Sequence, residues 1–302
     1  MQVGIIGLGK MGSGFALHLL ERGYEVVGFD QKPEVIKEFT KQNGVATESL
    51  EKLVSALKVP RLIILSIPHN SVGTVIFGDM GLVHFLSSGD FIIDATNSYY
   101  KNSIIRNKTL AEKGIDYLDA GVSGGPSGAL KGACFMIGGD EKVYKRLEPI
   151  FRDLSANEGY SYMGPSGAGH FVKMVHNGIE YALIQAYTEG FELLQAGPYK
   201  ELDLKKISRI WNNGSVVASF LLDIIEAVFA KNQTLDSIEG FVEDLGEGRW
   251  SVKEAIDDEI PADAIAHALF ARFRSRQKDS FAAKLTAAMR HEFGGHPIKE
   301  IQ

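Results

Sequence analysis

The chain has 302 residues, 45% of them hydrophobic and 23% charged, with a formal net charge of −6. The length favours two domains, each large enough to bury a hydrophobic core. The negative charge argues against nucleic acid or an acidic membrane as a partner. No apolar run approaches the ~20 residues of a membrane span, and strand-like Val3–Ile6 opens the chain without a basic leader, so we expect a cytoplasmic protein. Because Cys134 is the single cysteine, an internal disulfide is excluded, and no cluster of metal ligands stands out, so we expect no metal.

Short apolar runs alternate with helical segments from residue 2 to about 162. The expected strands are Val3–Leu8, Glu25–Phe29, Leu62–Ser66, Phe91–Asp94, Tyr117–Asp119, Ala133–Ile137 and Gly159–Met163. The clearest helix between them is Met11–Arg22. This alternation predicts an α/β fold, a Rossmann-type, doubly wound, mostly parallel sheet. Within Ala133–Ile137, we expect Cys134 to be an inert thiol in the core.

A turn-rich stretch, Gly164–Gly169, ends this pattern. After it the spacing is helical almost to the end, and no convincing strand appears. The helical segments are expected near 168–196, 203–210, 215–230, 251–257 and 262–293. We therefore predict an α/β domain over residues 1–165 and an all-helical domain over residues 166–302.

The first strand leads into a glycine motif for dinucleotides. Gly7, Leu8, Gly9, Lys10, Met11 and Gly12 form a G-x-G-x-x-G between a strand and a helix, and Asp30 follows 18 positions after the last glycine. The glycines permit a tight turn close to a pyrophosphate, and the carboxylate suits a ribose 2′-hydroxyl. Asp30 would repel a 2′-phosphate, so the motif favours NAD over NADP, although Lys32 softens this preference.

The helix expected over 168–196 carries a polar stripe. Lys173, His176, Asn177 and Glu180 are spaced at i, i+3, i+4 and i+7, which places them on one helix face. Burying such groups is costly unless they are paired or used in chemistry. Burial also disfavours the charged forms, so Lys173 can act as a base near neutral pH and Glu180 as an acid. The alternative is a solvated surface pair of Lys173 and Glu180.

Three motifs, in this order, resemble the β-hydroxyacid dehydrogenase superfamily: Gly7–Gly12, Gly121–Gly125 and Lys173-x-x-x-Asn177. Two further segments, Lys173–Tyr181 and Arg290–His296, resemble 6-phosphogluconate dehydrogenases in particular. The resemblance covers essentially the whole chain, and the length fits the short, often NAD-linked bacterial form. It implies a role in gluconate metabolism or the pentose phosphate pathway. An all-helical domain with many apolar helices and a tail that carries implied site residues suggests a homo-oligomer, a dimer or a tetramer.

The resemblance also implies roles for individual residues. Lys173 would be the acid/base, with Asn177 and Glu180 as further catalytic residues. The implied substrate-binding residues are Asn97, Ser123, Gly124, Gly125, His176, Asn177, Tyr181, Arg272, Arg290 and His296. Asn97 would also contact the nicotinamide, and the phosphate would lie against Tyr181, Arg272, Arg290 and His296, with Arg290 and His296 supplied either by the same chain or by a neighbouring subunit.

Two departures from the family pattern concern substrate binding. Leu245 stands where the long form has a phosphate-binding lysine, with Arg249 as a candidate replacement, and Ala95-Thr96 stands where Gly-Gly is usual.

The implied reaction is the oxidative decarboxylation of 6-phosphogluconate to ribulose 5-phosphate and CO₂ with reduction of NAD. Two alternatives are a dehydrogenase that acts on a small 3-hydroxy acid without decarboxylation and a non-catalytic nucleotide sensor. Glu180-Tyr181 and the Arg290–His296 segment argue against the first. The second predicts loss of Lys173 or Asn177, and both are present.

Overall fold

The computed structural model describes residues 1–42 and 44–299. The chain divides into two compact units, residues 1–177 and residues 178–302. Helix α8 (Ala168–Ala196) contributes its residues up to Asn177 to the first unit and the rest to the second.

The first unit is built on an eight-stranded sheet in the order β3-β2-β1-β4-β5-β6-β7-β8. The strands are β1 (Gln2–Ile6), β2 (Glu25–Phe29), β3 (Val45–Thr47), β4 (Leu62–Leu65), β5 (Phe91–Asp94), β6 (Asp116–Ser123), β7 (Ala133–Gly139) and β8 (Ser155–Gly164). Strands β1 to β6 are parallel, β7 is antiparallel to β6, and β8 is parallel to β7. The predicted mostly parallel α/β fold is confirmed.

The structure adds one strand that the sequence pattern did not predict. Strand β3 has only three residues, and its Val45 is 60% exposed, so it shows neither the length nor the alternation of a buried strand. Strand β8 is also longer than expected, starting at Ser155 directly after helix α7 (Glu141–Leu154).

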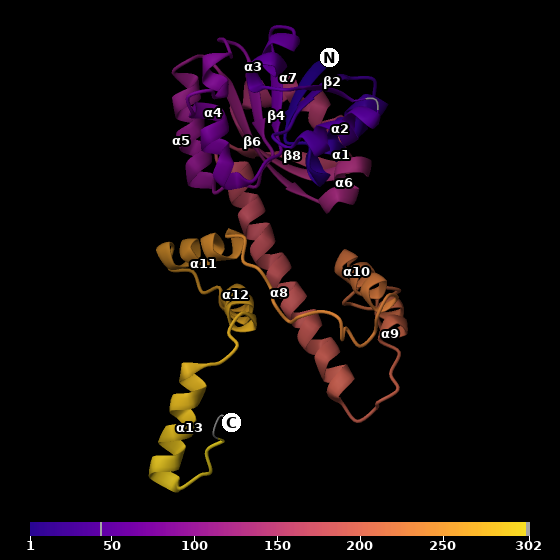
Figure 1. Cartoon of the computed structure of the whole chain (residues 1–302), viewed down its shortest axis with the longest axis vertical. Coiled ribbons are helices and arrows are strands. Elements are labelled where there is room, and N and C mark those ends of the chain that lie inside the picture. The colour runs from indigo at the N-terminus through magenta and orange to yellow at the C-terminus, as the bar shows by residue number, and fades with distance from the viewer. Residues whose placement is uncertain (43, 300–302) are drawn as a thin grey trace. The chain divides into compact units, whose positions relative to one another are not determined.

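Helices cover both faces of this sheet, as Figure 1 shows. One core cluster packs α1 (Lys10–Glu21), α2 (Pro33–Lys41), α6 (Gly125–Lys131) and α7 (Glu141–Leu154) on the sheet. The other packs α3 (Leu50–Ala56), α4 (Val72–Phe77) and α5 (Tyr100–Ala111), with the short 3₁₀ helices η1 (His69–Ser71) and η2 (Leu82–His84) nearby. Two apolar layers explain why the central strands are apolar on both sides.

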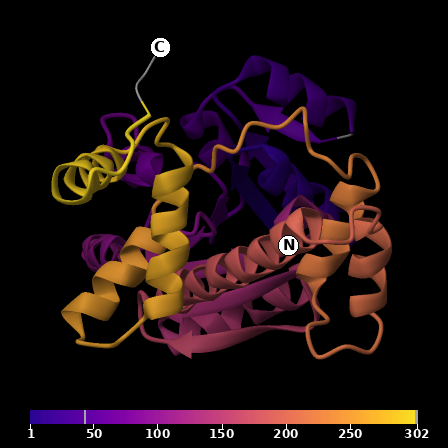
Figure 2. The ribbon, with the colours of Figure 1, turned by 90° about the horizontal axis from the view of Figure 1, so that it is seen from below.

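The described residues of the second unit form helices and connections but no strand, as predicted. Besides α8 it contains α9 (Leu204–Trp211), α10 (Phe220–Phe229), α11 (Glu247–Asp257), α12 (Asp263–Ser275) and α13 (Phe281–Gly294). Helices α9 and α10 lie side by side over a small core of Phe191, Leu204, Leu222 and Phe229 (Figures 1 and 2).

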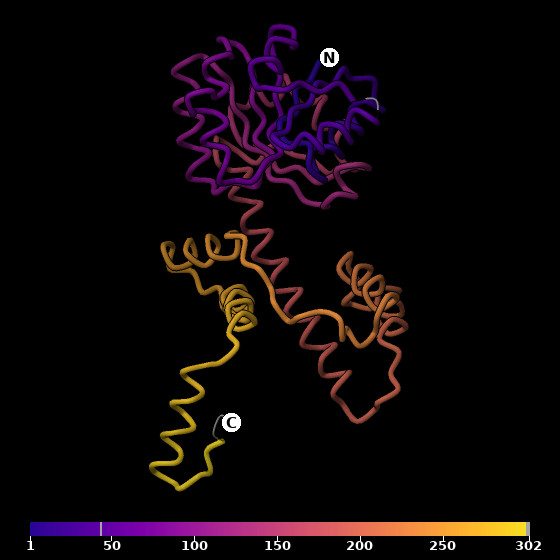
Figure 3. The backbone as a smooth tube through the Cα atoms, viewed as in Figure 1, coloured from indigo at the N-terminus to yellow at the C-terminus, as the bar shows by residue number. Residues whose placement is uncertain are grey.

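Helix boundaries in this unit differ from the predicted segments where polar caps intervene. The predicted segment 262–293 is two helices, because Ser280 caps α13 through the Ala283 amide and the chain turns at 276–280. Likewise α10 begins only after its N-cap, Ser219. Between α10 and α11, residues 230–246 form a long connection without helix or strand (Figure 3).

The expectation that Cys134 is a core thiol is wrong. The residue lies on β7 as predicted, but its side chain is exposed. Side chains alternate along a strand, so Ala133 and Phe135 point into the core while Cys134 points to the opposite face. Helix α8 covers that face at Met136, where Gly169 approaches the Met136 carbonyl oxygen, but leaves Cys134 accessible.

Candidate active site

The glycine motif forms a tight turn from β1 into α1. Gly7 has a φ of +90°, and a Cβ added at Gly12 would lie 1.8 Å from the Gly7 carbonyl oxygen. Gly9 and Lys10 are exposed, and Gly9, the N-cap of α1, makes no side-chain cap. The first amides of α1 are therefore left without a side-chain acceptor, the arrangement that suits a pyrophosphate.

Asp30 lies beside this turn, directly after β2. Its Oδ2 accepts from the Leu8 amide at 2.8 Å, and its Oδ1 accepts from the Lys32 amide at 2.9 Å. The carboxylate is thus oriented by one amide of the glycine turn and one amide of its own loop, half-buried, at the position where the motif places a ribose.

The loop after β5 is fixed by a buried carboxylate, Asp94. Its Oδ2 lies 3.1 Å from Arg106 Nη1 and accepts from the Tyr117 hydroxyl at 2.6 Å. Its Oδ1 accepts from the Thr96 hydroxyl at 2.5 Å. Burial, together with the Asp94 charge, raises the pKa of Tyr117 well above its usual value, so the phenol stays protonated as a donor.

Asn97 follows in this loop with the left-handed φ of 52°. Its Nδ2 donates to the Val122 carbonyl at 3.1 Å, and its Oδ1 accepts from the Val122 amide at 2.8 Å. These two bonds fix the orientation of the amide and hold Asn97 at the carboxyl end of β6, next to Ser123. The second Nδ2 hydrogen and the second Oδ1 lone pair remain for a ligand.

The Ser123-Gly124-Gly125 turn joins β6 to α6. Gly124 and Gly125 have φ values of 117° and 58°, a conformation that side chains rarely adopt. Ser123 Oγ lies 3.3 Å from His176 Nε2 on α8. The turn and the polar stripe of α8, predicted from segments some fifty residues apart, therefore meet.

Lys173 is buried, with 5% of its surface exposed, and Asn177 is buried as well. Lys173 Nζ lies 3.3 Å from His176 Nδ1, which lies 3.2 Å from Asn177 Oδ1. One ring nitrogen cannot donate to the amide oxygen and accept from an ammonium at once, so the His176 tautomer is linked to the protonation of Lys173. A Cβ at Gly121 would lie 2.3 Å from Lys173 Cβ, so this glycine allows the close approach.

The second unit brings Tyr181 and Arg272 together. The guanidinium of Arg272 lies 3.6 Å from the centre of the Tyr181 ring and donates to the Glu243 carbonyl at 3.2 Å. The Tyr181 hydroxyl donates to Glu247 Oε2 at 3.4 Å. Burial raises the pKa of Tyr181, and the nearby Glu247 charge raises it further.

Arg249 is not placed as a simple substitute for the missing lysine. It forms an ion pair with Asp244 and lies 4.5 Å over the Phe273 ring. Leu245 is 60% exposed. Arg290 and His296 are exposed, on α13 and just after it.

Three carboxylates in or next to these clusters were not identified from the sequence: Asp94, Glu247 and Asp119, which accepts from the Gly167 and His170 amides at the start of α8. Asp94 and Asp119 each interrupt or end an apolar strand, and both are fully buried. The sequence signal for both residues is a carboxylate within an apolar strand, because a buried carboxylate requires specific hydrogen-bond or ion-pair partners. Glu247 gave no such signal, since its partner Tyr181 is distant in sequence.

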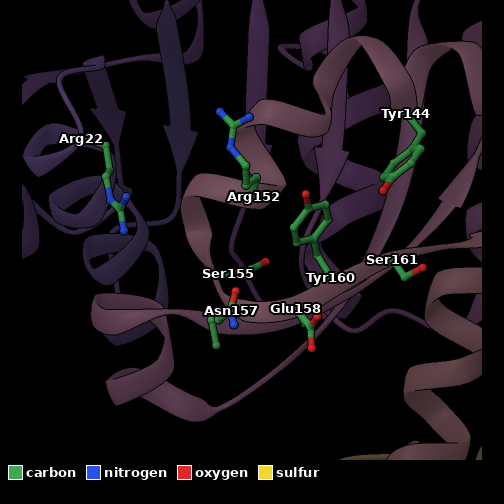
Figure 4. Close-up of a pocket in the computed structure, with 9 residues that line it drawn as sticks. Arg22, Tyr144, Arg152, Ser155, Asn157, Glu158, Tyr160 and Ser161 are labelled. Atoms are coloured by element: carbon green, nitrogen blue, oxygen red, sulfur yellow. The ribbon is translucent and has the colours of Figure 1, made fainter.

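A cavity of about 880 Å³ opens elsewhere in the first unit, at the start of β8 (Figure 4). It is lined by Arg22, Tyr144, Arg152, Ser155, Ala156, Asn157, Glu158, Tyr160 and Ser161. None of the predicted site residues lines it. Glu158 and Asp153, which is 3.2 Å from Arg152, offset the two arginines, so the cavity has no strong charge preference.

No helix in the described residues is long and apolar enough to cross a membrane. Among the same residues no group of three or more histidine, cysteine, aspartate or glutamate side chains is arranged to hold a metal ion.

A doubly wound sheet with this glycine turn, followed by a helix that carries a buried lysine, defines an NAD(P)-binding dehydrogenase. Residues 2–164 match the model of the NAD binding domain of 6-phosphogluconate dehydrogenase, and residues 169–302 match that of the 6-phosphogluconate dehydrogenase C-terminal domain. The chain belongs to the 6-phosphogluconate dehydrogenase family, which confirms the resemblance seen in its motifs.

The matches to similar proteins cover nearly the whole chain. YqeC of Bacillus subtilis, named provisionally as a 6-phosphogluconate dehydrogenase, is 44% identical over 300 residues, covering 99% of this chain and 100% of the relative. The NAD(+)-dependent, decarboxylating 6-phosphogluconate dehydrogenase of Haloferax volcanii is 38% identical, covering 99% and 98%. The NADP(+)-dependent, decarboxylating enzyme of Bacillus subtilis is 36% identical, covering 92% and 62%.

Among solved structures, the 6-phosphogluconate dehydrogenase of Plasmodium falciparum superposes with a TM-score of 0.82 at 31% identity. The match covers 97% of this chain and 65% of that one, so the longer enzyme has residues that this chain lacks.

Proposed function

We propose that this chain oxidises and decarboxylates 6-phosphogluconate to ribulose 5-phosphate and CO₂, with NAD as the electron acceptor. The observation that carries the proposal is the buried Lys173 amine, within 3.3 Å of His176 and beside Asn177 and the Ser123 turn. The family membership supports the reaction class. The named activity of the full-length Haloferax volcanii relative supports both decarboxylation and NAD.

The first unit has the features that an NAD molecule requires. The uncapped start of α1 suits the pyrophosphate, no atom lies within 4 Å of a Cβ built on Gly9, and Asp30 suits the adenosine ribose. Residues Gly7–Gly12 and Asp30 would hold the dinucleotide, and Asn97 would contact its nicotinamide. When bound, NAD supplies a hydride acceptor. We propose residues 1–165 as the cofactor-binding domain and 166–302 as the domain for substrate and oligomer contacts.

Lys173 and Glu180 carry out different proton transfers in the reaction. Neutral Lys173 takes the proton of the C3 hydroxyl as hydride leaves C3. The resulting β-keto acid loses CO₂, and protonated Lys173 donates to the C3 carbonyl oxygen, which takes up the electrons. Glu180 protonates C1 of the enediol while neutral Lys173 takes back the proton of the neighbouring enol hydroxyl, which restores the carbonyl and completes ribulose 5-phosphate. His176 and Asn177 bind substrate hydroxyls, and Ser123, Gly124 and Gly125 bind the carboxylate end.

The phosphate end is assigned to Tyr181 and Arg272, with Arg290 and His296 as further ligands. The guanidinium of Arg272, which stacks on the Tyr181 ring, supports this assignment, because an arginine has five N–H donors and the bond to the Glu243 carbonyl uses one.

The test is the absorbance at 340 nm with 6-phosphogluconate and either NAD or NADP. We expect rapid reduction of NAD, with one CO₂ and one ribulose 5-phosphate formed for each NADH. Activity with short 3-hydroxy acids, and none with 6-phosphogluconate, would overturn the proposal in favour of a non-decarboxylating dehydrogenase.

Asp30→Asn tests the cofactor preference. The amide keeps an acceptor oxygen beside the turn but removes the charge that repels a 2′-phosphate. We expect the ratio of kcat/KM for NAD over NADP to fall about 10-fold or more, equal to ~1.4 kcal/mol. Glu34→Gln, an exposed carboxylate in the first turn of α2, is the control and should leave the ratio unchanged. An equal ratio in Asp30→Asn and the parent chain would rule out Asp30 as the selecting group.

The apolar surface of residues 178–299 supports a homo-oligomer, a dimer or a tetramer. Phe220, Phe241, Phe270, Phe281 and Phe293 are each more than half exposed, and α13 has no buried residue. Exposed apolar area of this extent is unfavourable in water and marks association surfaces. Light scattering after size exclusion should give two or four times the chain mass of 33.0 kDa. A single chain mass at every protein concentration would contradict this.

A further inference from the structure

Helix α8 begins without a cap of its own. It starts at Ala168 after Gly167, whose carbonyl accepts the first helical bond, from the Phe171 amide at 2.9 Å. Gly167 has a φ of +94°, and a Cβ there would lie 2.8 Å from the Ile104 side chain. Close packing against α5 therefore requires a glycine at the position where a serine or aspartate would normally cap the helix.

Asp119, from the middle of β6, supplies the missing cap. Its Oδ1 accepts from the Gly167 amide at 2.6 Å, and its Oδ2 accepts from the His170 amide at 2.9 Å. These are the two amides, at the N-cap and three residues later, that a capping box normally satisfies with two side chains. Asp119 is fully buried, so its charge is stabilised by these amides and by the positive end of the 29-residue helix.

The neighbouring residues leave room for this arrangement. A Cβ at Gly138 would lie 2.8 Å from both Asp119 carboxylate oxygens, and a Cβ at Gly169 would lie 2.6 Å from the Asp119 carbonyl oxygen. His170 is held a second time, because its Nδ1 lies 2.7 Å from Ser103 Oγ on α5.

The cap lies at one end of a ladder of contacts between β6 and α8. Asp119, Gly121 and Ser123 alternate onto one face of β6. They meet His170, Lys173 and His176 in turn, at three-residue steps along the helix. A shift of the helix along its own axis would break the cap and displace the Lys173 amine from the Ser123 turn together.

We propose that Asp119 is a positioning residue: it fixes where α8 starts and thereby where the Lys173 amine meets the substrate. The proposal rests on the proposed role of Lys173. Asp119 touches no reacting atom and acts through the helix.

Asp119→Asn is the test variant, with Asp90→Asn as the matched control. Asp90 is equally buried and accepts from the Arg61 amide, the Arg61 guanidinium and the Ser87 amide. It precedes β5, at the opposite end of that strand from Asp94, which pairs with Asp119. Both variants lose a buried charge. Only in Asp119→Asn does a side-chain NH₂ group face one of the two backbone amides at the start of α8, which leaves these amides a single acceptor oxygen.

In Asp119→Asn we expect kcat to fall about 10- to 100-fold, the loss that a misplacement of ~1 Å can cause. NADH affinity should stay within about twofold, since β1, which leads into the cofactor turn, is separated from β6 by two strands. The deuterium isotope effect on kcat with 3-deuterated 6-phosphogluconate should rise, because misplaced Lys173 slows chemistry itself. Amide hydrogen exchange over residues 167–173 should accelerate. Asp90→Asn should change neither the isotope effect nor this exchange.

A fall in kcat with an unchanged isotope effect, or the same pattern in Asp90→Asn, would overturn the proposal. If Asp119→Asn does not fold, Asp119→Ser, which keeps one acceptor hydroxyl, is measured in the same way. If the parent chain reduces neither nucleotide, the proposed function fails. Hydrogen exchange then decides separately whether Asp119 holds the helix: acceleration at 167–173 supports it, and unchanged exchange overturns it.

Discussion

Lys173→Met is expected to lower kcat with 6-phosphogluconate about 10²- to 10⁴-fold, the range that a general acid/base supplies. Methionine keeps the unbranched stem that packs against Gly121 but has no group that can take the C3 proton. NADH binding, measured by fluorescence, should be unchanged, because the glycine turn and Asp30 are untouched.

The control for this variant is Lys37→Met, an exposed lysine on α2, which should retain full activity. A loss smaller than about tenfold in Lys173→Met would show that another group carries the proton. His176 would be the first to test, because its Nδ1 lies 3.3 Å from the amine.

Arg272→Ala is expected to raise KM for 6-phosphogluconate about 100-fold with little change in kcat. Two charge-assisted hydrogen bonds to a phosphate account for such a loss, at ~1.5 kcal/mol or more each. Steady-state kinetics with gluconate in place of 6-phosphogluconate should show no difference between variant and parent, because that substrate has no phosphate to lose.

Arg274→Ala is the matched control for this second variant. Arg274 is exposed on the same helix and donates to Gln277 at 3.2 Å, so its removal should change KM less than about twofold. Equal effects of the two substitutions would indicate a diffuse basic surface, and the phosphate assignment would then fail.

The first part of the fold could be predicted because local signals agree there. The apolar run of β1, the glycine turn, the spacing in α1 and the acid after β2 all favour one β-α-β arrangement. Helix α8 was predicted with its observed limits, because glycines stand at both ends, at Gly167 and Gly197.

The polar groups that arrange the site could not be predicted in the same way. Asp94 depends on Arg106 and Tyr117, and Asp119 on the first turn of α8, so each partner is supplied only by folding. The pair of Tyr181 and Glu247 is likewise separated by more than sixty residues. Periodicity reports which face is apolar, but it does not report which distant group satisfies a buried charge.

The single, accessible thiol gives this chain a built-in attachment point. Cys134 pairs with Ser123 across the β6–β7 ladder, so a fluorophore coupled to it would stand next to the proposed substrate site. Partial burial raises the pKa of the thiol, and the Lys173 charge lowers it by a smaller amount, so coupling calls for mildly alkaline buffer. With no second cysteine to react, the label would report ligand arrival at one position in every molecule, without prior mutagenesis.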